Sequence, residues 1–172
     1  MAGHLAGKNI AVTGAGNGIG RGIALACAAE GANVVVADYG VTMDGSDPSS
    51  EVADVVVDEI RAAGGTATAV AGDVSEMAVG QRIVDTAVQN WGTIDGVVCV
   101  AGIVRERMLF NMTEEEWDSV VDVHMKGTFT TTKYASIHWR TERKGHYRLI
   151  NFSSGSRLHG AAGQPTYAAA TR

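Results

Sequence analysis

Three of the four glycines that follow a short apolar stretch near the start of the chain could bind a phosphate group. They are Gly14, Gly18 and Gly20 in the run TGAGNGIG, and residues 19–30 then carry apolar side chains at helical spacing. Backbone N–H groups in the first turn of a helix attract an anion, and glycines let a pyrophosphate come close. The strict G-x-G-x-x-G spacing is absent, so the prediction depends on the position of the turn between a strand and a helix. An ordinary glycine-rich turn is the alternative.

A carboxylate ends the next apolar run, ANVVVAD. In a strand–helix–strand unit, an acidic residue at this point can accept hydrogen bonds from the ribose of an adenosine, and it would repel a 2′-phosphate. Asp38 therefore indicates NAD rather than NADP, with an ordinary turn residue as the alternative.

Hydroxyl groups gather near the last residues of the chain. Ser153 and Ser154 follow the apolar run LINF, and Tyr167 comes after a glycine-containing stretch. Hydroxyls that follow a buried strand are candidates for catalysis. Both serines are candidates on this pattern alone.

Alternating strands and helices must position these residues. Strands are expected within residues 8–14, 32–38, 66–74, 94–102 and 149–154. Helices are expected over residues 19–30, 52–63, 75–90 and 113–139, with another beginning at 164–166. Continuous apolar strands joined by helices predict an α/β fold, a Rossmann-type doubly wound parallel sheet with helices on both faces. No repeat or linker divides the sequence, so residues 1–172 are expected to form a single dinucleotide-binding domain.

Composition narrows the class of protein. The chain has 172 residues, of which 45% are hydrophobic and 19% charged, and its net charge is −5. It has no basic surplus with which to bind nucleic acid or an anionic membrane. Its two cysteines lie in apolar segments, its histidines show no metal-ligand spacing, and no apolar run suggests a signal peptide or a membrane span. We therefore expect a soluble cytoplasmic protein with no metal, no nucleic-acid partner and no membrane partner.

Taken together, the motifs resemble those of the classical short-chain dehydrogenase/reductase family. The resemblance depends on Thr13-Gly14, Gly18, Gly20, Asp73-Val74, Ala101-Gly102, Ser154 and Tyr167. It implies an enzyme that transfers a hydride between NAD and a secondary alcohol or ketone. The cofactor-binding residues that it implies are Gly14, Asn17, Gly18, Ile19, Gly20, Asp38, Asp73, Val74, Ala101, Gly102 and Tyr167.

The resemblance also implies catalytic roles. Tyr167 would transfer the proton and Ser154 would polarise the substrate oxygen, because the family spacing selects Ser154 over Ser153. A phenol has an ordinary pKa of about 10, which is poorly matched to neutral pH. In the family, a lysine one helical turn later lowers the pKa of the tyrosine. Thr171 occupies that position, and the neighbouring Arg172 is no simple replacement for an ammonium group.

Two further positions depart from the family pattern. His124 lies where the family has an asparagine, and Cys99-Val100 replaces two asparagines. With the segments AGIVRERMLFNMTEEEWD and VHMKGTF, His124 resembles the 3-hydroxyacyl-CoA dehydrogenase units of peroxisomal multifunctional enzymes and their bacterial relatives. This resemblance makes His124 a third candidate catalytic residue and an acyl-CoA a candidate substrate, while a steroid or another secondary alcohol stays open.

The resemblance also predicts the length and the oligomeric state of the natural protein. The family sheet has six or seven strands, so we expect a fold truncated after the fifth strand and a longer natural protein that forms a homodimer or homotetramer. The alternative to an enzyme is an NAD-binding protein that has lost catalysis and acts as a sensor or assembly partner. Thr171, Cys99 and Val100 motivate that alternative.

Overall fold

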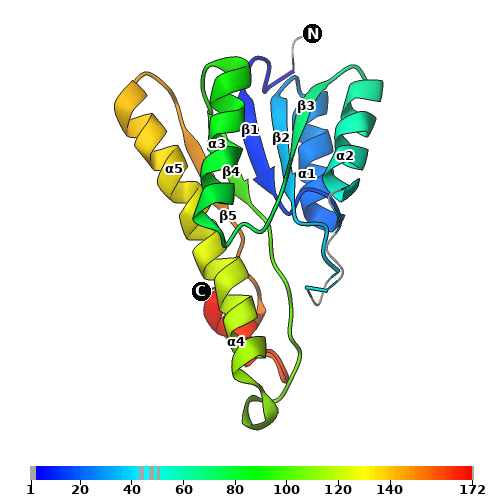
Figure 1. The fold of residues 1–172 in the computed structure, drawn as a ribbon, viewed down its shortest axis with the longest axis vertical. Helices are drawn as coiled ribbons and strands as arrows, with labels where there is room; N and C mark the ends of the chain where they lie inside the picture. Colours follow the sequence, from blue (N-terminus) through cyan, green and yellow to red (C-terminus); the bar gives the residue numbers. More distant parts are fainter. Residues whose placement is uncertain (1–2, 43–44, 47–48, 50, 172) are drawn as a thin grey trace.

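A parallel sheet of five strands in the order β3-β2-β1-β4-β5 forms the centre of the molecule (Figure 1). The computed structural model describes residues 3–42, 45–46, 49 and 51–171. The strands are β1 (Asn9–Thr13), β2 (Asn33–Asp38), β3 (Thr66–Ala71), β4 (Gly96–Cys99) and β5 (Arg148–Asn151). This arrangement confirms the predicted α/β fold with a doubly wound parallel sheet, because the strand order runs outward from β1 in both directions.

Helices connect successive strands, and two more follow β5. They are α1 (Gly18–Ala29), α2 (Glu51–Ala62), α3 (Met77–Trp91), α4 (Glu114–Val121), α5 (Gly127–Glu142), α6 (Ser156–His159) and α7 (Pro165–Ala170). A short 3-10 turn, η1, covers Leu109–Asn111. The helix expected over residues 113–139 begins where its capping residue predicts, since the Thr113 hydroxyl accepts a hydrogen bond from the backbone N–H of Glu116 and the Glu116 carboxylate accepts one from that of Thr113.

A wider turn interrupts that long helix. Between α4 and α5, residues Asp122–Lys126 (η2) adopt a π-helical turn, and His124 lies within it. The π-helical turn changes the direction of side chains relative to a regular α-helix, and such turns occur often at functional sites. The sequence predicted one regular helix here, and the structure corrects this prediction.

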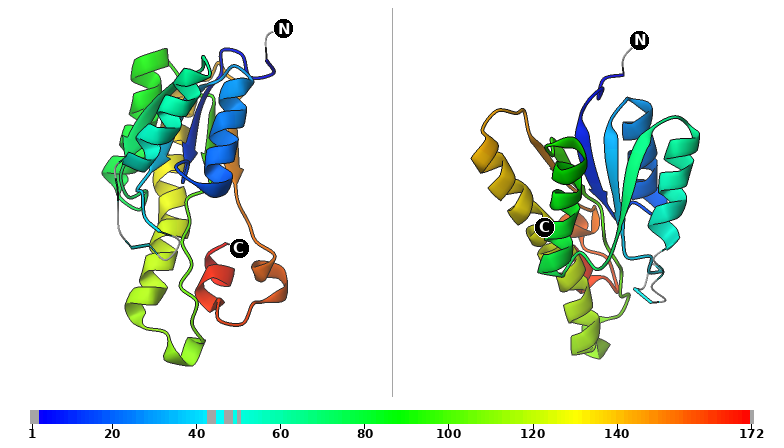
Figure 2. Two further views of the ribbon diagram at one scale, coloured as in Figure 1. Left: turned by 90° about the vertical axis from the view of Figure 1, so that its right-hand side faces the viewer. Right: turned by 45° about the horizontal axis from the view of Figure 1, so that its top comes forward.

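Helices cover both faces of the sheet because the side chains of its strands alternate between two cores. Val34 and Val36 of β2 pack on the face covered by α1 and α2, where Ile60 is fully buried. Val35 of β2 packs on the opposite face, with Ile83 of α3 and residues of α5. The two views of Figure 2 show these layers on either side of the strands.

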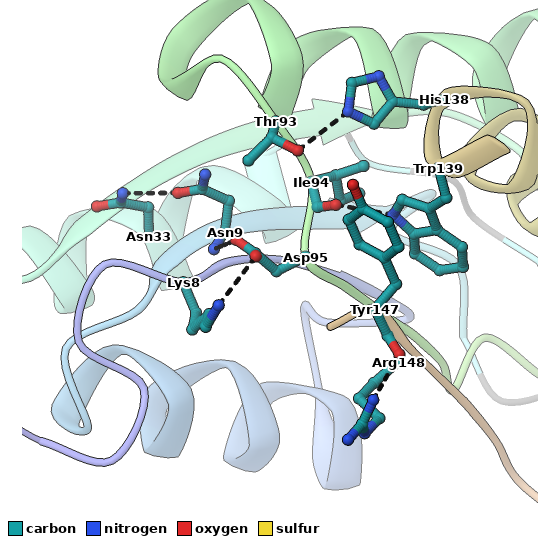
Figure 3. Close-up of polar contacts among 10 residues, drawn as sticks. All are labelled: Lys8, Asn9, Asn33, Thr93, Ile94, Asp95, His138, Trp139, Tyr147 and Arg148. Carbon is teal, nitrogen blue, oxygen red and sulfur yellow. Dashed lines mark hydrogen bonds and ion pairs between the residues drawn. The ribbon is translucent and has the colours of Figure 1, made fainter. Parts of the chain in front are cut away.

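Polar contacts join the amino ends of the strands (Figure 3). The Asp95 carboxylate accepts hydrogen bonds from the backbone N–H of Asn9 (2.9 Å) and from the Lys8 ammonium (3.1 Å). The indole N–H of Trp139 donates to the Ile94 carbonyl at 2.8 Å, and its ring stacks on Tyr147 with centroids 5.2 Å apart. These contacts attach α5 to the sheet, at the opposite end from the predicted site.

The carboxyl ends of the strands face the segments that carry the candidate catalytic residues. In Figure 1 the arrowheads of β1 and β2 point toward α4, which extends beyond the sheet. The left view of Figure 2 shows the chain after β5 (orange to red) turning back beside this extension, and α4 packs against α7. Strand β5 lies at the sheet edge, where Ile150 is half exposed.

Candidate active site

The glycine turn lies at the carboxyl end of β1, and backbone atoms pack closely against two of its glycines. Gly14 has a φ of +64°, and a Cβ atom there would lie 2.7 Å from the Ala101 Cα atom. A Cβ atom on Gly20 would lie 2.0 Å from the carbonyl oxygen of Gly14. Only glycine fits at both positions, because any side chain would clash with backbone atoms that cannot move aside.

Space above the turn is open at Gly18. A Cβ atom on Gly18 would meet nothing within 4 Å, and the φ of +50° at Gly18 also favours glycine. Gly18 begins α1, Asn17 is its N-cap without a side-chain capping bond, and the Ile19 side chain is 66% exposed. The first N–H groups of a helix lack intrahelical partners, so this open turn can bind an anion. The residues present therefore fit the pyrophosphate of a dinucleotide.

Asp38 lies beside this turn and is held by two backbone groups. Its carboxylate accepts hydrogen bonds from the N–H of Gly16 (2.7 Å) and from the N–H of Gly40 (2.6 Å). A carboxylate can accept about four hydrogen bonds, so lone pairs remain for the hydroxyls of a ribose. The structure thus places a fixed negative charge next to the glycine turn.

The segment after β4 lies directly against the turn. The Thr13 hydroxyl accepts hydrogen bonds from the N–H groups of Val100 and Ala101, both at 3.2 Å. The two asparagines that the family places at 99–100 are therefore not needed to tie β1 to this segment. Burial raises the pKa of the Cys99 thiol to about 11, which keeps the thiol protonated at neutral pH.

Asp73 and Val74 begin the segment after β3. The Asp73 carboxylate accepts a hydrogen bond from the N–H of Ser75 at 2.8 Å and so forms a tight turn. The Val74 carbonyl accepts one from the hydroxyl of Thr130 in α5 at 2.6 Å, and a Cβ atom on Gly127 would lie 2.6 Å from Val74. These contacts fix the segment beside the carboxyl end of β2, where Asp38 lies.

His124 connects the segment after β4 to the candidate tyrosine. Its Nε2 atom lies 3.2 Å from the backbone nitrogen of Ile103 and 2.9 Å from the Ile103 carbonyl oxygen. A Cβ atom on Gly102 would lie 2.4 Å from the imidazole, so this glycine is required by the close packing of the ring. Burial lowers the pKa of His124, and the backbone hydrogen bond to Ile103 only partly offsets that effect.

Tyr167 lies in α7 with its ring against this histidine. The ring centroids of His124 and Tyr167 are 5.1 Å apart and the ring planes are inclined by 80°, an edge-to-face contact. The Thr171 hydroxyl donates to the Tyr167 carbonyl at 2.9 Å and is buried. The position of the family lysine therefore holds a neutral side chain that bonds to its own helix. Arg172 lies outside the described residues.

The two serines make different contacts. The Ser153 hydroxyl donates to the Thr171 carbonyl at 3.1 Å, so it supports the last turn of α7. The Ser154 hydroxyl oxygen accepts a hydrogen bond from the N–H of Ser156 at 3.2 Å. That bond leaves the hydroxyl proton of Ser154 for another acceptor. The choice of Ser154 over Ser153 stays a prediction from the family spacing.

The family model for short chain dehydrogenases matches residues 8–171. The chain belongs to the short-chain dehydrogenase family. The resemblance inferred from its motifs is therefore confirmed, and with it the assignment to a family of oxidoreductases.

Relatives extend the comparison. The chain is 46% identical to the hydroxyacyl-CoA dehydrogenase ChsB1 of Mycobacterium tuberculosis, over 96% of this chain and 53% of that protein. It is 43% identical to the peroxisomal multifunctional enzyme type 2 of Drosophila melanogaster, over 95% of this chain and 27% of that protein. A crystal structure of a short chain dehydrogenase from Mycobacterium avium superposes with a TM-score of 0.89 at 48% identity, covering 98% of this chain and 60% of the other. The chain thus spans about half the length of ChsB1.

The described residues also bear on metal binding and on membrane spans. Within the described part of the chain, no group of three or more His, Cys, Asp or Glu side chains is arranged to hold a metal ion. None of the described helices combines the length and the apolar character that crossing a membrane requires.

Sequence reasoning missed two members of the site region. Gln164, expected only as a helix start, and Glu106 form a hydrogen bond of 2.6 Å between segments 58 residues apart. No local pattern marks such a pair, since each residue resembles an ordinary polar loop residue until the chain folds.

Proposed function

We propose that this protein is an NAD-dependent oxidoreductase that transfers a hydride between the cofactor and a secondary alcohol or ketone. The observation that carries the proposal is the contact of Tyr167 with His124, whose imidazole binds the backbone at Ile103, next to Ala101-Gly102. It brings the proton-transfer candidate to the segment that packs on the glycine turn.

The cofactor would occupy the carboxyl ends of β1, β2 and β4. The turn at Gly14, Gly18 and Gly20 would hold its pyrophosphate, and Asp38 would bind the adenosine ribose and exclude a 2′-phosphate. The cofactor would also be bordered by Asn17, Ile19, Asp73 and Val74. When bound, the nicotinamide supplies hydride transfer, and the chain supplies orientation and a group that takes a proton from an alcohol or gives one to a ketone.

Tyr167 and Ser154 would act on the substrate oxygen. Ser154 keeps its hydroxyl proton available, because its oxygen already accepts from the N–H of Ser156, so it can donate to a carbonyl or hydroxyl oxygen. Tyr167 would remove the proton of an alcohol or return it to a ketone. The neutral imidazole of His124 would orient the tyrosine ring without adding a positive charge beside it.

The names of the relatives support a substrate class. ChsB1 is a hydroxyacyl-CoA dehydrogenase, and the matched peroxisomal proteins include hydratase-dehydrogenase-epimerases. We therefore propose a 3-hydroxyacyl-CoA as the substrate. The cytoplasmic location and the homo-oligomeric full-length form stay predictions from the sequence.

Spectroscopy of NADH formation tests this function. The purified protein is incubated with NAD and, in separate assays, a 3-hydroxyacyl-CoA, a hydroxysteroid and a simple secondary alcohol. We expect NADH to form with the thioester, and both Tyr167→Phe and Ser154→Ala to abolish most of the rate. Ser153→Ala is the matched control, because its hydroxyl only supports α7. Normal NAD binding without turnover of any alcohol would refute the proposal.

A further inference from the structure

Gln164 lies at the meeting point of three segments. It is the N-cap of α7, which carries Tyr167. Its side-chain amide nitrogen donates to the Glu106 carboxylate at 2.6 Å, and its amide oxygen accepts from the Ser156 hydroxyl at 3.0 Å. Glu106 belongs to the segment after β4, and Ser156 begins α6 after β5, so one side chain connects both to the tyrosine helix.

The chemistry of the partners fixes the direction of these bonds. An ionised carboxylate can only accept, so the NH₂ group of Gln164 must face Glu106. The amide oxygen then faces Ser156, whose hydroxyl must donate. The backbone N–H of Ser156 in turn donates to the Ser154 oxygen at 3.2 Å. The polarity set at Glu106 is thus carried through Gln164 to the hydroxyl of Ser156, whose backbone contacts the proposed substrate-binding Ser154.

We infer that Gln164 is a positioning residue that fixes the place of Tyr167 relative to Ser154, with Glu106 orienting its amide. This inference depends on the proposed roles of Ser154 and Tyr167. The backbone of Gln164 begins α7, where its carbonyl accepts a hydrogen bond from the N–H of Ala168 at 3.0 Å. Its side chain contacts Ser156, in the segment that follows β5. Rotation of this one side chain would therefore release Ser156 from the helix of Tyr167, and with it the segment that carries Ser154.

Other contacts keep these segments folded when Gln164 is changed. The N–H of Arg107 donates to the Gly163 carbonyl at 2.7 Å, and the Arg107 side chain pairs with Glu116. The Thr166 hydroxyl contacts the sulfur of Met112 at 2.9 Å. Because these contacts do not involve Gln164, its variants should perturb the local alignment more than the fold.

An exchange of donor and acceptor tests the inference. Gln164→Glu alone brings two carboxylates together and should break the link. The double variant Glu106→Gln with Gln164→Glu restores a donor facing an acceptor, and it still offers Ser156 an oxygen. Gln89→Glu adds the same charge on the exposed face of α3 and serves as the matched control.

Two readouts apply to each variant. For turnover with NAD and a 3-hydroxyacyl-CoA, we expect Gln164→Glu to lower kcat by about tenfold or more, with the KM for NAD unchanged, and the double variant to recover most of the loss. In hydrogen–deuterium exchange, segments 153–160 and 164–171 should exchange faster in Gln164→Glu and return to the wild-type rate in the double variant. Wild-type exchange in all variants, or no recovery in the double variant, overturns the inference. If the wild-type protein turns over no alcohol, the proposed function fails, and exchange alone then decides the position of Gln164.

Discussion

The imidazole of His124 meets the phenol ring of Tyr167 edge to face, with ring centroids 5.1 Å apart. The two residues come from different parts of the chain, one from the π-helical turn between α4 and α5 and the other from α7. The same imidazole binds the backbone of Ile103 through Nε2. One side chain therefore links the proton-transfer candidate to the segment beside the glycine turn, and its removal should affect both stability and activity.

Replacing His124 by alanine should destabilise the protein by about 1–3 kcal/mol, because an aromatic pair and a backbone hydrogen bond are lost together. His124→Asn should cost less, since its amide can still bond to Ile103. Urea denaturation measures the free energy of unfolding. His138→Ala is the control for activity, because His138 bonds to Thr93 at the opposite end of the sheet. A similar loss of NADH formation in both alanine variants would contradict the role given to His124.

The stability of the protein should fall as pH decreases below about 6.5, the ordinary value for histidine. The folded pKa of His124 is lowered by burial, so below the ordinary value the unfolded chain binds more protons than the folded one. The loss should end once pH passes below the folded pKa. Comparison of the wild-type protein with His124→Asn between pH 7.5 and 5 isolates this contribution. The advantage of the wild type should shrink with falling pH, and a growing advantage would contradict the prediction.

Asp38 should determine the preference between NAD and NADP. Asp38→Ala removes a charged acceptor, and we expect NAD affinity to fall by about 10-fold to 100-fold while the affinity for NADP rises relative to it. Titration followed by protein fluorescence or calorimetry measures both constants. Asp38→Asn is the matched control, because its amide oxygen can still accept from the Gly16 N–H while the charge is removed. An unchanged ratio of NAD to NADP affinity in both variants would show that another group sets the preference.

The structural features that the sequence predicted correctly are those determined by residues close to one another in the chain. The glycine turn, Asp38 at the end of β2 and the capping box at Thr113 each follow from residues near one another in sequence, and the structure has all three. Alternating apolar strands and helices likewise predicted the parallel sheet.

Long-range contacts could not be predicted in the same way. The π-helical turn at His124 arises where the ring packs on Gly102 and Ile103, which no helical periodicity reveals. The link from Glu106 to Gln164 needs two loops to meet after folding. The direction of the Thr171 side chain depends on a hydrogen bond to its own helix rather than on residue type alone.

Thr171→Lys should increase the rate of alcohol oxidation at neutral pH. Thr171 lies one helical turn after Tyr167, where an ammonium group would stabilise a phenolate, and a stabilisation of about 2.7 kcal/mol corresponds to roughly a hundredfold. The bond from Ser153 reaches the backbone carbonyl of residue 171, so the substitution leaves this support of α7 in place. Initial rates of NADH formation at pH 7 measure the gain. Thr171→Met, of similar length but uncharged, is the control, and an equal gain in that variant would attribute the effect to packing rather than to charge.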